Sequence, residues 1–463
     1  MTQSPFPLTD ELRNRVKQIL KNNLWEKIEG QPAVSMKTIQ TMKLIASIDP
    51  VGALEWTGEN KLPDQMAMMI RQQAFVAQME TDAEEVFDKV SQIEDPMMRS
   101  MVMGLFLRKL PGKHPALAAV ENQLVEDSRS IKQPAMRLAL RASIAEHYQL
   151  TSRPELADKI VAQHIEEAKK LPSGGWSAYP RSLYAALVAE SDPKLAEEMI
   201  TGIGDSSKAT RAQSRVAFAC CRTNPELAIK LLAMYEADEN TITVWRNSIK
   251  VAVRMAVEQP KAAQKLAASI EEANQRAWAL GLMADRVNDS NPQLAKQLLQ
   301  QAIDALSDPA SEKQDWFPAG QTLAGLLPIA QRIEPSKVRP MIWQAIYKTL
   351  PKSRWVSGTS NKVKLQSVAA AIARYDLELG RTLFGKKLLE PGNMFAESAA
   401  RQALLAPTEL PAYAENVLEF DDVRQNRIIE NLIVVLSANE QQFWQSTSRP
   451  MMLNWPTPGF EEF

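Results

Sequence analysis

The chain has 463 residues, of which 45% are hydrophobic and 24% are charged. This composition is typical of a chain that folds around a core, and it excludes a wholly disordered protein. Its 54 Lys and Arg residues nearly balance 55 Asp and Glu residues, so no overall field draws it to nucleic acid or to an acidic membrane, and any charged site must be local.

The two cysteines, Cys220 and Cys221, are neighbours in the sequence. They provide neither a disulfide framework nor a four-ligand zinc site, and we interpret them as small core residues of a chain in a reducing compartment. The N-terminal segment lacks a signal-peptide pattern, and no run of about 18 apolar residues occurs anywhere. A cytoplasmic protein with no membrane-spanning segment is therefore expected.

The first expected element is an amphipathic helix within residues 1–36. Apolar residues recur in it at helical spacing from Leu12 to Trp25, and Thr9 followed by Asp10 marks its start. We expect this helix to cap the N-terminal end of the fold.

A recurring junction then predicts the start of one helix after another. A polar residue precedes a proline, and an alanine follows one turn later; Asp or Asn is a preferred N-cap, and a proline in the first helical position loses no hydrogen bond. The clear copies are Asp49-Pro50, Asp192-Pro193, Asn224-Pro225, Gln259-Pro260 and Asn291-Pro292. Weaker copies are Asp82-Ala83, His114-Pro115, Arg153-Pro154, Glu334-Pro335, Asp376-Leu377, Ala406-Pro407 and Asn439-Glu440.

The junctions recur every 31 to 43 residues or so, which is the length of two helices and two turns. About eleven such helix pairs fill residues 37–446, and almost no segment shows the alternation typical of strands. One pair does not bury its apolar stripe alone, so successive pairs must stack. The predicted fold is therefore all-α, an α-solenoid of antiparallel helix pairs, with surface loops near residues 307–314 and 352–362. Residues 447–463 form a non-helical tail.

The cadence A-x-x-x-A-x-x-D-P-x-x-A, seen in residues 184–196, resembles the class of TPR-like and HEAT-like helical repeats, without pointing to one family. The resemblance implies recognition of another macromolecule on a concave face. Tetratricopeptide repeats keep a strict period of 34 residues, and PPR-type RNA binders also keep a fixed period. The wandering period here matches neither, and no nucleic acid is expected as a partner.

An arginine stands 12 to 16 residues before the proline of the next junction in six units. We expect each arginine to begin the second helix of its pair, helix B. The six arginines should then line one edge of the superhelix. One interpretation is an ion pair with an acidic turn residue, such as Asp95, Asp205 or Glu272, that fastens the units together. The other is a groove that binds an acidic or extended peptide. The candidate partner-binding residues are Arg99, Arg141, Arg181, Arg211, Arg246 and Arg276.

Motifs that carry chemistry are sparse. The three histidines, His114, His147 and His164, do not show the spacing of metal ligands, and His164 is expected on a solvated face. The glycines near Gly202 follow a helix, which is typical of an interhelical turn and not of a phosphate-binding loop. No catalytic residue, cofactor or metal ligand is predicted, and most of the ten tryptophans are expected in the core or at its rim.

The pattern favours a binding or scaffolding protein with a protein or peptide partner and no membrane association. Two alternatives stay open: an all-α enzyme using the carboxylates Glu419, Asp421 and Asp422, and a helical-repeat nucleic-acid binder. The apolar, proline-rich tail has two interpretations as well: a strap that covers the last helix pair, or a recognition peptide for a partner.

Overall fold

The computed structural model describes residues 6–79, 82–109, 116–204, 206–234, 241–307, 319–349, 365, 368–384, 403–418, 423–440 and 442–443. Every regular element in these ranges is an α-helix or a short 3-10 helix, and no strand occurs among them. The predicted all-α class is therefore confirmed. The loops expected near residues 307–314 and 352–362, and the tail 447–463, fall wholly or almost wholly outside the described residues.

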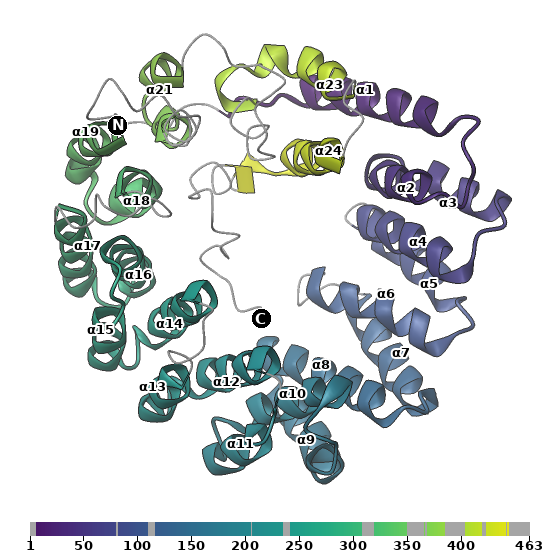
Figure 1. The fold of residues 1–463 in the computed structure, drawn as a ribbon, viewed down its shortest axis with the longest axis horizontal. Coiled ribbons are helices and arrows are strands. Elements are labelled where there is room, and N and C mark those ends of the chain that lie inside the picture. Colours follow the sequence, from purple (N-terminus) through teal and green to yellow (C-terminus); the bar gives the residue numbers. More distant parts are fainter. Residues whose placement is uncertain are drawn as a thin grey trace. The chain divides into compact units, whose positions relative to one another are not determined.

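The chain forms two compact units. Figure 1 labels the helices of both. Unit 1 combines residues 6–78 with the described residues from 299 onward. Its elements are α1 (Asp10–Ile28), α2 (Met36–Ile48), α3 (Pro50–Glu59), α4 (Asp64–Met79), α18 (Ala319–Ile333), η3 (Pro335–Lys337), α19 (Val338–Thr349), α21 (Leu377–Phe384), η4 (Pro407–Glu409), α23 (Leu410–Leu418) and α24 (Val423–Ser437).

Unit 2 contains residues 79–298, and α17 (Pro292–Ser307) crosses the division. Its elements are α5 (Ala83–Ser91), α6 (Pro96–Lys109), α7 (Leu117–Ser130), α8 (Pro134–Leu150), α9 (Pro154–Lys169), η1 (Gly175–Ser177), α10 (Ala178–Val188), α11 (Pro193–Ile200), α12 (Ser206–Cys220), α13 (Pro225–Ala233), α14 (Thr241–Met255), α15 (Pro260–Ala268) and α16 (Ala273–Val287).

The predicted junctions begin helices where expected. The clear copies start α3, α11, α13, α15 and α17 at Pro50, Pro193, Pro225, Pro260 and Pro292. Asp192 and Asn224 are N-caps whose side chains accept the backbone N–H groups of Leu195 and Leu227. Of the weaker copies, Asp82, Asp376 and Asn439 cap in the same way, Pro154 starts α9, and Pro335 and Pro407 start 3-10 helices. His114-Pro115 lies outside the described residues.

Asp49 departs from the capping pattern. Its side chain does not cap α3; the carboxylate instead accepts the indole N–H of Trp25 at 3.0 Å and pairs with Lys21, also at 3.0 Å. Gly52 permits this arrangement, because a Cβ atom there would lie 2.7 Å from the Asp49 carboxylate. This junction therefore ties α1 to the pair α2 and α3.

Unit 2 consists of two rows of helices. We define row A as α5, α7, α9, α11, α13 and α15, and row B as α6, α8, α10, α12, α14 and α16. Each helix contacts the next helix in sequence, and each row-B helix also contacts the next row-B helix. Figure 1 shows the two rows side by side from α9 to α15. This serial contact pattern is what stacked helix pairs produce.

Neighbouring row-B helices run parallel in register. Ser182 of α10 accepts a hydrogen bond from Arg215 of α12, and just beyond the C-terminal ends of these two helices Glu190 pairs with Arg222. The same register recurs between α12 and α14, where Asn247 donates to Ser214 at 2.6 Å. The partners in these pairs are 32 or 33 residues apart, which is one repeat.

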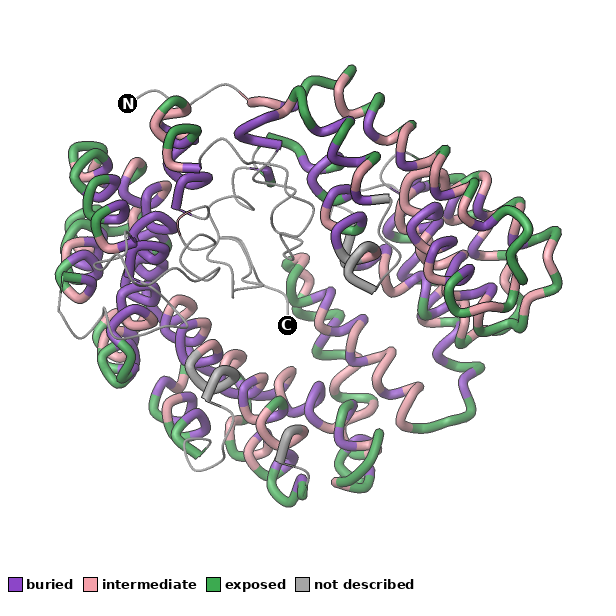
Figure 2. Tube along the Cα trace, turned by 45° about the horizontal axis from the view of Figure 1, so that its top comes forward, coloured by how far each residue is buried: buried purple, intermediate pink, exposed green. Residues whose placement is uncertain are grey.

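In unit 1 the two ends of the sequence share a core. Thr9 caps α1 as predicted, but α1 packs on α23 and α24, and α2 also contacts α24. Val16, Leu20 and Leu24 of α1 are fully or almost fully buried in the same cluster as Leu432. Figure 2 shows buried positions recurring along the described helices. The N-terminal helix therefore covers helices from the far end of the sequence, whereas the sequence analysis placed it at a separate end.

Candidate functional site

Three of the predicted arginines occupy one structural position. Arg99, Arg181 and Arg276 are each the fourth residue of a row-B helix, namely of α6, α10 and α16. Each guanidinium donates to a backbone carbonyl in the turn before its own helix: Arg99 to Ile93, Arg181 to Leu171 at 3.1 Å, and Arg276 to Ile270 at 2.7 Å. These arginines close the turn between the two helices of a pair.

Sequence reasoning missed the equivalent residue of α8, which is Arg137 and not Arg141. Arg137 is the fourth residue of α8, donates to the carbonyl of Ile131 at 3.4 Å, and pairs with Glu167. Arg141 lies one turn later and donates to the Ser128 hydroxyl at 3.1 Å. The signal that identifies Arg137 is its place four residues after Gln133, the N-cap of α8.

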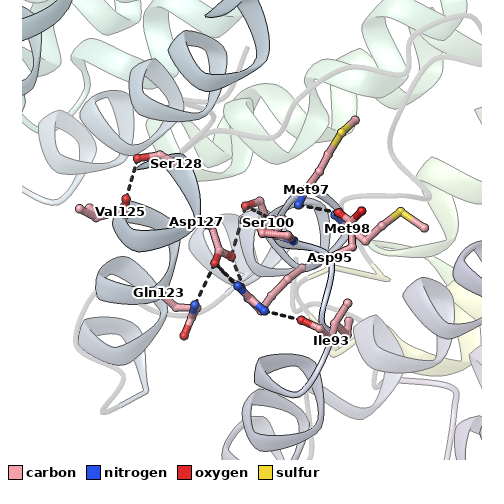
Figure 3. Close-up of polar contacts among 11 residues, drawn as sticks. Ile93, Asp95, Met97, Met98, Ser100, Gln123, Val125, Asp127 and Ser128 are labelled. Atoms are coloured by element: carbon pink, nitrogen blue, oxygen red, sulfur yellow. Dashed lines mark hydrogen bonds and ion pairs between the residues drawn. The ribbon is translucent and has the colours of Figure 1, made fainter. Parts of the chain in front are cut away.

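A contact between Arg99 and Asp127 also joins α6 to α7, and Figure 3 shows Asp127 with Ser100 and Gln123 beside it. Its Nε lies 3.0 Å from both carboxylate oxygens of Asp127, whose side chain is 1% exposed. Ser100 and Gln123 also donate to this carboxylate. A buried carboxylate needs such donors, because desolvation otherwise disfavours its charge. Arg99 thus fastens two helices, as one of the two interpretations predicted. Its acidic partner is however Asp127 of α7, and the turn residue Asp95 caps α6 instead.

Arg211 and Arg246 lie elsewhere on their helices, as the sixth residues of α12 and α14. Arg211 is exposed and Arg246 is half-buried. The six predicted arginines therefore occupy three different positions along their helices, and the structure does not bring them together as one equivalent set. Their role in partner binding stays a prediction.

Arginines of row B also stack on aromatic rings of the preceding row-B helix. The Arg215 guanidinium of α12 lies 5.3 Å from the ring centroid of Tyr179 in α10, and the Arg254 guanidinium of α14 lies 4.2 Å from that of Phe218 in α12. Such cation–π contacts are favourable and keep the charged group close to the surface. They hold two cations in place on row B.

Charge is divided unequally between the two rows. The row-B helices contain 14 Lys or Arg residues and two Asp or Glu residues, whereas the row-A helices contain eight and 13. The contrast is strongest in α10, α12 and α14, whose sequences contain no acidic residue. Their seven basic residues are Arg181, Lys208, Arg211, Arg215, Arg246, Lys250 and Arg254. The near-neutral charge of the whole chain conceals this separation.

We call the surface formed by Lys208, Arg211, Arg215, Arg246 and Lys250 the cationic face. Burial lowers the pKa of the half-buried Lys250 ammonium, and the nearby positive charge of Arg246 lowers it further. An anion placed here would offset both causes, because it favours the charged form of the lysine. The electrostatics of this surface therefore suit a negatively charged ligand.

An exposed aromatic turn lies beside the cationic face. The side chain of Trp176 in η1 is 81% exposed, and Tyr179, which carries the Arg215 guanidinium on its ring, is 40% exposed. Sequence analysis expected most tryptophans in the core or at its rim; Trp278, at 5% exposure, fits that expectation and Trp176 does not. Exposure of a single aromatic residue has no local sequence signal, because it depends on what packs around it.

A buried polar cluster connects α7 and α8. Glu121 and His147 are each 7% exposed at the side chain, and His147 Nε2 lies 3.1 Å from Glu121 Oε1. Arg153 donates to both Glu121 oxygens and lies over the ring of Tyr148. Burial lowers the pKa of His147 despite the neighbouring carboxylate. The Glu121 and His147 side chains are thus closed from solvent and fasten two helices.

The other reactive side chains are also engaged or buried. His164 is half-buried with Nε2 2.6 Å from the Arg141 guanidinium, so its expected place on a solvated face is wrong. Cys220 and Cys221 are buried free thiols, as predicted, and burial raises their pKa to about 11 and about 12. In the described part of the chain no cluster of three or more metal-ligating side chains occurs. The carboxylates Glu419, Asp421 and Asp422 lie outside it.

No family model matches the chain, and neither a curated protein nor a solved structure matches it. Among the described helices, none combines the length and the apolar character required to cross a membrane.

Proposed function

We propose that the chain is a helical-repeat binding protein that presents row B to an acidic segment of a protein partner. The observation that carries this proposal is the separation of charge between the rows, with seven basic and no acidic residues in α10, α12 and α14. A surface of one sign attracts and orients a partner of the opposite sign.

The architecture that we propose for this function is an α-solenoid of helix pairs. It is supported by contacts that recur one repeat apart, such as Ser182 with Arg215 and Ser214 with Asn247. Solenoids of this type display one row of helices as an extended surface. Such a surface suits an extended peptide, which gains contacts from several repeats at once.

A peptide suits the cationic face better than a nucleic acid strand does. Proteins that bind single strands without sequence preference combine many phosphate-binding cations with aromatic side chains that stack on successive bases. Here Arg215 and Arg254 use their guanidinium groups in contacts with other row-B helices. The surface therefore offers a few fixed cations, which match a few carboxylates.

Selection from a random peptide library by the immobilised protein tests the proposal. We expect enrichment of peptides rich in Asp and Glu, and loss of this enrichment in the variant R211E/R246E. The variant R339E is the matched control, because Arg339 is exposed on α19 of unit 1. Thermal denaturation followed by circular dichroism checks that both variants fold. Selection without acidic enrichment, or enrichment that persists in R211E/R246E, would contradict the proposal.

A further inference from the structure

The aromatic turn and the cationic face meet at one level of row B. Arg215 contacts Tyr179, and α10 and α12 are parallel. Arg211 precedes Arg215 by one turn on α12, and Trp176 precedes Tyr179 by about one turn in η1. Because parallel helices in register keep equal steps aligned, Arg211 and Trp176 lie at the same level. A cation and an apolar ring are thus available at one level of two neighbouring helices.

Both side chains are available to a ligand. Within the described part of the chain, neither Arg211 nor Trp176 has a side-chain hydrogen bond, ion pair or ring contact. Trp176 lies in a 3-10 turn that begins at Gly175, which has a φ of +61°. A residue with a side chain rarely adopts that φ. A large exposed aromatic ring is a binding group that loses little side-chain entropy when a partner covers it, because it has only two side-chain torsions.

We propose that Trp176, Tyr179, Arg211 and Arg215 form the anchor of the peptide site, which takes a short acidic segment with one large apolar side chain beside its carboxylates. This inference rests on the proposed function and specifies the ligand for it. Trp, Tyr and Arg are the residue types that most often dominate binding energy at interfaces. The apolar side chain packs on Trp176 and Tyr179, and the carboxylates pair with Arg211. Arg215, whose guanidinium already stacks on Tyr179 and donates to Ser182, adds positive charge beside them.

The charges around the anchor favour carboxylates on the ligand. Lys208 lies one turn before Arg211 on α12, and α10 and α12 contain no acidic residue that would repel a carboxylate. Burying a large apolar side chain of the ligand against the two rings favours binding by about tenfold or more. The anchor therefore distinguishes an acidic peptide that carries an apolar residue from one that does not.

Two fluorescein-labelled peptides test the anchor by fluorescence anisotropy: a short glutamate-rich peptide with a central phenylalanine, and the same peptide with glycine in its place. We expect the intact chain to bind the phenylalanine peptide about ten times more tightly. W176A should abolish this preference, whereas R211E should weaken binding of both peptides. The control variant W343A removes a tryptophan that is 54% exposed on α19 of unit 1 and should change neither affinity.

Three results would overturn the anchor. The first is that W176A keeps the preference for phenylalanine, and the second is that the intact chain binds neither peptide. The third is that labelled oligouridylate binds more tightly than both peptides and that this binding depends on Trp176. The proposed function is judged separately by the library selection. If acidic peptides are selected there but W176A has no effect here, the cationic face binds its partner without this anchor.

Discussion

The two units join their helices in different ways. In unit 2, every helix contacts its neighbours in sequence, and polar contacts recur about one repeat apart. In unit 1, the core joins α1 to α23 and α24, which lie near the opposite end of the sequence. Unit 1 thus adds contacts between distant segments to the local contacts that both units share, such as that of α18 with α19. Distant contacts cost more chain entropy to form, so they need more apolar burial.

The largest effect is expected from removing apolar contacts between the ends. Leu20 and Leu24 are at most 1% exposed in the core that α1 shares with α23 and α24. Because each buried Leu→Ala change costs about 2–5 kcal/mol, the variant L20A/L24A should separate α1 from α23 and α24. Hydrogen exchange measured by mass spectrometry should show lost protection in α23 and α24. R15A, at an exposed position of α1, is the control, and unchanged protection in L20A/L24A would refute the joined core.

A smaller loss is expected from breaking a polar contact in unit 2. D127A leaves Arg99 largely buried without its carboxylate partner, which should lower the free energy of unfolding by about 3 kcal/mol. E126A, which removes the neighbouring but exposed partner of Arg129, should cost at most about 0.5 kcal/mol. Urea denaturation measures both values. Equal losses in the two variants would show that the Asp127 contact stabilises no more than a surface ion pair.

Closing the turn between paired helices should matter less again. R276M removes the hydrogen bond from the guanidinium to the Ile270 carbonyl and should cost about 1 kcal/mol. K265M, on the exposed side of α15, changes charge and shape in the same way without removing such a bond. A midpoint of urea denaturation that is lower for R276M than for K265M would show that Arg276 stabilises the turn between α15 and α16. Identical midpoints would exclude a fastening role for this arginine.

The smallest effect concerns pH. Because burial lowers the pKa of His147 below its value of about 6.5 in the unfolded chain, the unfolded chain takes up a proton first as the pH falls. The His147 contribution to stability is therefore intact above that value and is lost as the pH falls below it. H147Q should reduce the loss of stability between pH 8 and pH 5. If the pH dependence of the free energy of unfolding is unchanged in this variant, the loss belongs to other groups. One of them is His164, whose pKa is also lowered.

Local signals predicted the helix starts well. Capping depends on the first turn of a helix alone, so Asp192 and Asn224 identified α11 and α13 without any knowledge of the fold. The site was predicted less well. Counting back from Pro154 selected Arg141, although Arg137 holds the equivalent position, because interval lengths vary while the position within a helix does not.

The sequence by itself determined the all-α class, the starts of the helix pairs and the burial of Cys220 and Cys221, since these depend on residues close together in the chain. The tertiary structure decided which distant surfaces meet. The apolar stripe of α1 could pack against many other apolar stripes, and only the tertiary structure selects α23 and α24 as its partners. Exposure of Trp176 follows for the same reason, because it depends on which helix faces remain uncovered once the rows have stacked.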